Sequence, residues 1–150
     1  MAYVLLATDA DWIADEITAA LAGPEVTVGR VSAGEQVVPA VKHLEPNLVI
    51  LDLQMGNMGG FASCMAIRHE EGMGRIDITA VLMLLDREAD TFLARRADAD
   101  GWLTKPLDSL RLRRAAGALL AGKSWFDGFV PEDTMSEDVD DGGPAEEATA

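Results

Sequence analysis

Five short apolar runs punctuate the first 104 residues, and each is followed by a segment with apolar residues at helical spacing. The runs cover residues 3–7, 26–31, 47–53, 80–85 and 101–104. Those at 47–53 and 80–85 are apolar at consecutive rather than alternate positions, which is typical of strands buried on both faces of a parallel sheet. We therefore interpret all five runs as β-strands.

The segments between the runs are predicted to be helices because their apolar residues recur every three or four positions. They cover residues 13–21, 37–44, 61–68, 89–97 and 109–121. Asp9 or Asp11 is expected to cap the first helix, and Asp108 or Ser109 the fifth. Pro39 lies inside the second, which we expect to be short or kinked.

Strand and helix alternate five times, which predicts an α/β fold with a parallel sheet and helices on both of its faces. In the fourth helix, Phe92, Leu93 and Ala97 are expected to face inward. From about Asp127 onward the chain is rich in Gly, Pro and acids and poor in large apolar residues, so we expect disorder there. We accordingly predict a domain at 1–123 and an acidic tail at 124–150.

The formal net charge of −14 is concentrated at the C-terminal end of the chain. Residues 127–150 contain nine acids and no base, whereas residues 1–126 contain 17 acids and 12 bases. A chain without a concentrated basic surface is not expected to bind nucleic acid, and anionic membranes should repel it. No apolar stretch approaches the roughly 18 residues of a membrane span, and no signal peptide is recognisable, which favours a cytoplasmic protein.

Cys64 is the single cysteine of the chain. A disulfide within the chain and a thiolate metal cluster are therefore excluded. We interpret Cys64 as a small buried apolar residue.

Polar residues stand where the predicted strands end. Thr8 and Asp9 follow the first run, Asp52 closes the third, Asp86 follows Leu85 at the end of the fourth, and Lys105 and Pro106 follow the fifth. Ligands of open parallel sheets bind beyond the carboxyl ends of the strands, so these side chains should converge. Carboxylates suit Mg²⁺, a lysine suits a phosphoryl group, and an aspartate can attack phosphorus.

Two stretches carry a family resemblance. "LVILDLQMGNMGGF" (48–61) and "DGWLTKPL" (100–107), together with Asp9, resemble the receiver domain of two-component response regulators over about residues 3–121. The resemblance implies a flavodoxin-like (βα)5 fold with a five-stranded sheet in the order 2-1-3-4-5. It also implies a signalling domain rather than an enzyme, with at most self-catalysed phosphotransfer and dephosphorylation.

The resemblance further implies roles for individual residues. Asp52 would be the phosphoacceptor, and Lys105, placed by Pro106, would pair with the phosphoryl oxygens. Mg²⁺ would be held by Asp52, by Asp9 and by the backbone carbonyl of Gln54. Trp102, which lies three positions before the lysine, would be the switch aromatic.

The sequence departs from the family pattern at several positions. Thr8 stands where a second acid is usual, Leu85 where a hydroxyl is usual, Asp86 where a small residue is usual, and Gly56 where a proline is usual. These departures leave two hypotheses open. The chain is a phosphorylatable receiver, or it is a degenerate pseudo-receiver that acts as a phosphorylation-independent interaction or dimerisation module.

As a receiver, the chain would take its phosphoryl group from a histidine kinase or a phosphotransfer protein. About 29 residues remain after Ala121, so we expect a single-domain response regulator that signals to a downstream protein partner. By resemblance, the fourth and fifth helices are where a homodimer would form.

A competing motif is "GALLAGKS" (117–124), which fits the nucleotide-binding pattern G-x-x-x-x-G-K-[S/T]. A functional phosphate loop follows a strand and opens a helix, whereas this segment ends a predicted amphipathic helix. We therefore interpret it as a helix end, with Gly122 as the left-handed cap and Lys123 near the negative end of the helix dipole.

Overall fold

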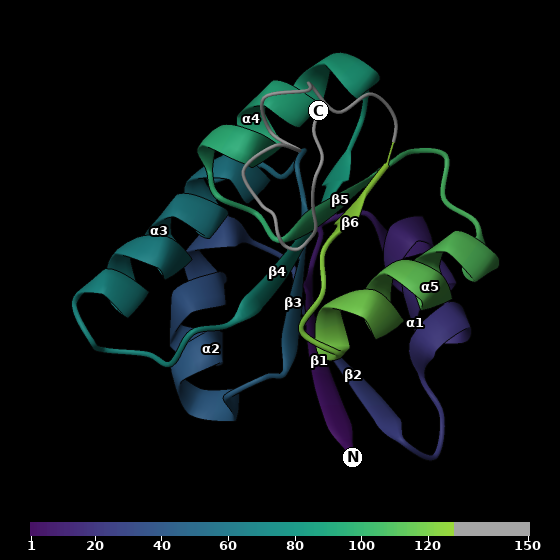
Figure 1. Ribbon diagram of the computed structural model, residues 1–150, viewed down its shortest axis with the longest axis horizontal. Coiled ribbons are helices and arrows are strands. Elements are labelled where there is room, and N and C mark those ends of the chain that lie inside the picture. Colours follow the sequence, from purple (N-terminus) through teal and green to yellow (C-terminus); the bar gives the residue numbers. More distant parts are fainter. Residues whose placement is uncertain (128–150) are drawn as a thin grey trace, which may run out of the picture.

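The computed structural model describes residues 1–127, in which strands and helices alternate along the chain (Figure 1). The strands are β1 (Ala2–Ala7), β2 (Val26–Val31), β3 (Leu48–Asp52), β4 (Ala80–Leu85), β5 (Gly101–Thr104) and β6 (Trp125–Phe126). The helices are α1 (Asp11–Leu21), α2 (Val37–Leu44), α3 (Gly60–Gly72), α4 (Thr91–Arg96) and α5 (Ser109–Leu120). Short 3₁₀ turns precede α2 and α4, namely η1 (Gly34–Gln36) and η2 (Glu88–Asp90).

The strands form one sheet in the order β2-β1-β3-β4-β5-β6, and all neighbouring pairs are parallel. The flavodoxin-like arrangement and the order 2-1-3-4-5 are thus confirmed. The number of strands is corrected from five to six, because Trp125–Phe126 pairs with Gly101–Trp102 at the edge of the sheet. The sheet therefore continues past Lys123, where the predicted domain ended. A strand of two residues has no periodicity from which it could be predicted.

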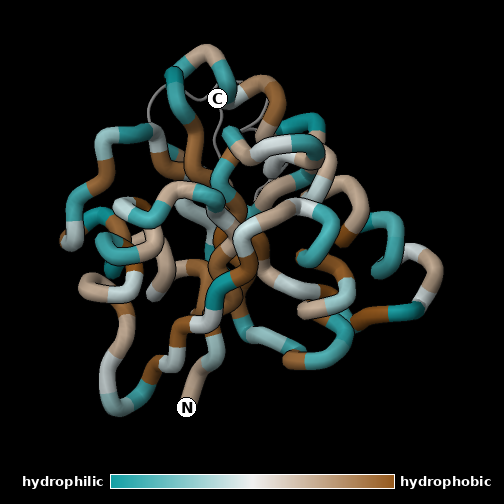
Figure 2. Tube along the Cα trace, turned by 180° about the vertical axis from the view of Figure 1, so that it is seen from behind, coloured by the Kyte–Doolittle hydropathy of each residue, from teal (hydrophilic) through white to brown (hydrophobic). Residues whose placement is uncertain are grey.

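Helices cover both faces of the sheet, α1 and α5 on one side and α2, α3 and α4 on the other (Figure 1). Successive strand residues point to opposite faces, so Leu48 and Ile50 pack beneath α1 and α5 while Val49 and Leu51 pack beneath α2 and α3. Hydrophobic positions gather along the central strands in Figure 2. The consecutive apolar pattern is explained by this double burial.

Some details of the helices differ from the prediction. Neither Asp9 nor Asp11 caps α1, whose N-cap is Ala10 with no side-chain hydrogen bond. Asp108 does cap α5 by accepting a hydrogen bond from the backbone N–H of Arg111. Phe92, predicted to face inward, is 56% exposed, because η2 takes up the start of the predicted fourth helix and turns α4.

The segment 117–124 is a helix end, as predicted. Gly117 lies within α5, and Gly122 follows it with φ of 82°, the left-handed conformation that favours glycine at this position. Cys64 is fully buried, as predicted. The disorder predicted for the acidic tail falls on residues 128–150, which lie outside the described residues. Within residues 1–127, no helix is long and apolar enough to cross a membrane.

Candidate functional site

Asp52, the last residue of β3, is the centre of the site. Its side chain is buried, with 1% of the residue exposed. Thr8, fully buried after β1, donates its hydroxyl to Asp52 Oδ2 at 2.7 Å. Asp52 Oδ1 accepts bonds from the Lys105 ammonium at 2.7 Å and from the backbone N–H of Gln54 at 3.3 Å. The carboxylate is therefore held at both oxygens by groups from three strand ends.

Lys105 follows β5 and bridges two carboxylates. Its Nζ lies 2.7 Å from Asp52 Oδ1 and 2.8 Å from Asp86 Oδ1, and its own backbone N–H donates to the carbonyl of Leu85. Burial by itself would lower the pKa of Lys105, but the hydrogen bonds to Asp52 and Asp86 outweigh burial and the pKa is raised. Lys105 is therefore charged at neutral pH. The peptide bond between Lys105 and Pro106 is cis.

The end of β4 supplies an acid and no hydroxyl. Leu85 is fully buried in the core cluster that also contains Trp102. Asp86 contributes one oxygen to Lys105, while its other oxygen is buried without a hydrogen-bond partner in the described part of the chain. Asp86 thus shares the Lys105 ammonium with Asp52, while Leu85 supplies no hydrogen-bonding side chain.

Asp9 lies at the exposed edge of the site. Its Oδ2 accepts a hydrogen bond from the backbone N–H of Gly56 at 3.0 Å, which ties the loop after β3 to the end of β1. Within residues 1–127, no group of three or more acidic, histidine or cysteine side chains could hold a metal ion. Mg²⁺ needs only one or two carboxylates because it keeps several waters, so Asp9, Asp52 and a backbone carbonyl such as that of Gln54 fit this ion.

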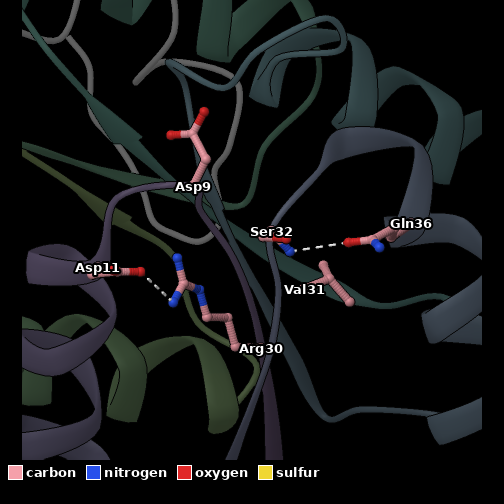
Figure 3. A pocket seen from close by; sticks show the side chains of 6 residues that line it. All are labelled: Asp9, Asp11, Arg30, Val31, Ser32 and Gln36. Carbon is pink, nitrogen blue, oxygen red and sulfur yellow. Dashed lines mark hydrogen bonds and ion pairs between the residues drawn. The ribbon is translucent and has the colours of Figure 1, made fainter.

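An open hollow of about 500 Å³ adjoins Asp9 and is lined by residues of β2 and of the segments that follow β1 and β2 (Figure 3). Arg30 in β2 donates two hydrogen bonds to the carbonyl of Thr8, at 3.1 and 3.0 Å, and pairs with Asp11 at 2.9 Å. In Figure 3 the Asp9 side chain is directed away from this pair. Arg30 therefore fixes the backbone beside Asp9, a role that sequence reasoning missed.

Trp102 in β5, the predicted switch aromatic, is 1% exposed. Its ring packs against Phe126, with a centroid separation of 4.5 Å, and its indole N–H donates to the carbonyl of Asp127 at 3.0 Å. Sequence reasoning missed Phe126 and Asp127 because it placed both in the tail. Of the predicted residues, Thr8, Asp52, Asp86 and Lys105 are in direct contact, whereas Asp9 joins them through the loop that contains Gly56.

Comparison with known proteins agrees with this geometry. The family model of the response regulator receiver domain matches residues 4–116, so the chain belongs to this family of signalling domains. The nitrate/nitrite response regulator protein NarL of Escherichia coli K12 is 34% identical over 101 residues, which cover 67% of this chain and 45% of NarL. The DNA-binding response regulator MtrA of Mycolicibacterium smegmatis is 29% identical over 103 residues, or 69% of this chain and 43% of MtrA.

Solved structures support the same fold. The signal receiver domain of NarL from Mycobacterium tuberculosis has a TM-score of 0.72 at 24% identity, covering 81% of this chain and 98% of that one. Chemotaxis protein CheY4 of Vibrio cholerae has a TM-score of 0.69 at 23% identity, covering 78% of this chain and 97% of that one. The chain spans less than half the length of the curated relatives NarL and MtrA. What it shares with them is the receiver domain.

Proposed function

We propose that this receiver accepts a phosphoryl group on Asp52 from a histidine kinase or a phosphotransfer protein, in a Mg²⁺-dependent reaction. The observation that carries the proposal is the buried Asp52 carboxylate at the end of β3, with the Lys105 ammonium 2.7 Å away. A nucleophile beside a fixed cation is what phosphoryl transfer requires, because catalysis of this reaction is mainly positioning and charge stabilisation.

In the proposed transfer, a carboxylate oxygen of Asp52 forms a bond to phosphorus as the bond between phosphorus and the donor's histidine nitrogen breaks. Lys105 remains protonated and moves its hydrogen bond from the carboxylate to the phosphoryl oxygens. The Thr8 hydroxyl orients the carboxylate from the other side. A Mg²⁺ ion held by Asp9, Asp52 and the Gln54 carbonyl would screen the negative charge that accumulates.

Asp86 is expected to slow the reaction. Its carboxylate shares Lys105 with Asp52 at nearly equal distance, 2.8 against 2.7 Å, and so competes with an incoming phosphoryl group for the same ammonium. Leu85 offers no hydroxyl to replace that contact. We therefore expect Asp86→Ala to be phosphorylated faster than the wild type, because Lys105 would then be shared with fewer anions.

Intact-protein mass spectrometry after incubation with acetyl phosphate and Mg²⁺ tests the proposal. The wild type should gain the mass of one phosphoryl group, Asp86→Ala should gain it sooner, and Asp52→Asn should gain none. Absence of an adduct from the wild type and from Asp86→Ala would refute the proposal.

The Asp86–Lys105 pair also favours a second function, that of a pseudo-receiver. In this function the Asp86 carboxylate is a permanent anionic partner of Lys105, so the ammonium is paired without a phosphoryl group. The chain would then bind its partner equally well whether or not a phosphoryl donor is present. A partner affinity that changes on phosphorylation would exclude this alternative.

For either function, we propose a cytoplasmic protein whose output is contact with a downstream protein. The α4 and α5 helices remain the proposed homodimer surface, although β6 covers the outer edge of β5 between them. Light scattering with and without acetyl phosphate would measure the oligomeric state, and a monomer under both conditions would argue against this dimer.

A further inference from the structure

The three residues Trp125–Asp127, which we name the β6 latch, close over β5 on the opposite side from β4. Phe126 stacks on Trp102 at 4.5 Å with an angle of 41° between the rings. The backbone carbonyl of Asp127 accepts the indole N–H of Trp102 at 3.0 Å, and its backbone N–H donates to the carbonyl of Trp102 at 3.2 Å. The aromatic residue implied as the switch is thus fixed by the latch at its ring, its indole nitrogen and its backbone.

The Asp127 side chain extends this hold toward Lys105. Its Oδ2 accepts the backbone N–H of Thr104 at 3.0 Å, and the same oxygen is paired with Arg111 of α5. Arg111 in turn donates to the carbonyls of Thr104 at 3.2 Å and Pro106 at 3.0 Å. Asp127 and Arg111 therefore hold the backbone on both sides of Lys105, although neither touches its ammonium.

The β6 latch packs closely against Gly101 at the start of β5. A Cβ at Gly101 would lie 2.6 Å from the Trp125 carbonyl and 3.1 Å from Leu119 of α5, so the close approach of β6 requires glycine at this position. The Asp127 side chain is 24% exposed, which shields its bonds to Thr104 and Arg111 from much of the competition with water.

We propose that Asp127 is a positioning residue for Lys105, acting through Thr104 and Arg111, so that the Asp52 site depends on the chain beyond α5. The inference rests on the proposed function only as far as the role of Lys105 is concerned. Phosphoryl transfer is sensitive to placement, since a misplacement of about 1 Å can lower a rate about 100-fold. Loss of the Asp127 carboxylate should release the end of β5 and let Lys105 move away from Asp52.

The test compares Asp127→Ala, Asp127→Asn and Asp100→Ala in the full chain. Asp100 is a matched control, because its Oδ2 likewise accepts a strand N–H, that of Val81, and pairs with an arginine, Arg68, both at 2.8 Å. The N–H that Asp100 holds lies in β4, whereas the N–H that Asp127 holds lies at the end of β5, next to Lys105. Asparagine at 127 retains an acceptor for the Thr104 N–H and should rescue most of the effect.

Two readouts separate positioning from general stability. Hydrogen exchange followed by NMR should show the Lys105 amide and the Trp102 indole exchanging about tenfold faster in Asp127→Ala, near wild-type rates in Asp127→Asn, and unchanged rates in Asp100→Ala. Phosphorylation by acetyl phosphate with Mg²⁺ should slow about tenfold in Asp127→Ala alone.

Unchanged exchange in Asp127→Ala would overturn the inference, and so would faster exchange with an unchanged phosphorylation rate. If the wild type takes up no phosphoryl group while Asp127→Ala still exchanges faster at Lys105, the proposed function fails but the positioning contact is supported. The experiment thereby distinguishes failure of the proposed phosphoryl transfer from failure of the positioning role of Asp127.

Discussion

Replacement of Lys105 by methionine tests how strongly the site is held by its buried charges. Methionine keeps most of the aliphatic stem but removes the ammonium that lies 2.7 Å from Asp52 and 2.8 Å from Asp86. Asp52 would then keep the Thr8 hydroxyl and the Gln54 N–H as partners, with no cation beside a carboxylate that is 1% exposed.

The expected loss follows from this geometry. Removing one partner of a buried ion pair lowers the free energy of unfolding by about 3–5 kcal/mol. The lower end applies here, because the Lys105 side chain is 14% and the Asp86 side chain 31% exposed, so that water can reach part of the cluster. We therefore expect Lys105→Met to be less stable than the wild type by about 3 kcal/mol.

A double-mutant cycle isolates the charge effect. Asp52→Asn alone leaves Lys105 paired with Asp86 and should lower the free energy of unfolding by about 1 kcal/mol. In the double variant Lys105→Met/Asp52→Asn, no charge remains at position 52. The free energy of unfolding should therefore fall by about 2 kcal/mol less than the sum of the two single-variant losses.

The assay is urea denaturation at pH 7, followed by circular dichroism and analysed at constant slope. A loss below about 1 kcal/mol for Lys105→Met, or additive losses in the cycle, would refute the reasoning. Lys42→Met serves as the control, because Lys42 pairs with Glu70 at 3.0 Å but its side chain is 46% exposed, so its loss should be small.

Three further predictions follow from the described residues. The pKa of Lys105 is raised from 10.5, so the stabilisation by its ammonium should be complete below pH 10.5 and decline above it. The urea midpoints of the wild type and Lys105→Met should therefore converge at high pH. A constant difference between the two midpoints up to pH 12 would contradict this. Burial raises the pKa of Cys64 to about 12, so a thiol reagent at pH 8 should label the protein only after unfolding, and rapid native labelling would contradict its placement. Gly101→Ala should lower the melting temperature and expose the Trp102 indole to exchange, because the new Cβ would lie 2.6 Å from the Trp125 carbonyl; an unchanged indole would show that β6 does not require this close approach.

The sequence was sufficient to predict the five main strands, most clearly β3 and β4, which are buried on both faces and apolar at consecutive positions. Grouping Asp52 with Lys105 needed only the rule that ligands bind beyond the carboxyl ends of parallel strands. The bond from Thr8 to Asp52 and the sharing of Lys105 with Asp86 were not predictable, because both depend on side-chain orientation.

The contacts that sequence reasoning missed come from residues distant in the chain. Arg111 in α5 reaches back to the carbonyls of Thr104 and Pro106, and no local sequence pattern indicates these contacts. Asp127 is one acid among many in its segment, and nothing in its neighbours distinguishes it. Phe92 was assigned inward by helical spacing, which fails because the preceding turn is 3₁₀ and changes the helix phase.

The most direct test of the central claim is to identify the residue that carries the phosphoryl group. The protein would be phosphorylated by acetyl phosphate with Mg²⁺, digested, and mapped by mass spectrometry before and after treatment with neutral hydroxylamine. We predict one phosphorylated peptide containing Asp52, whose phosphoryl group hydroxylamine releases because it is an acyl phosphate. A phosphoryl group on another residue, one that resists hydroxylamine, or none at all would contradict the account.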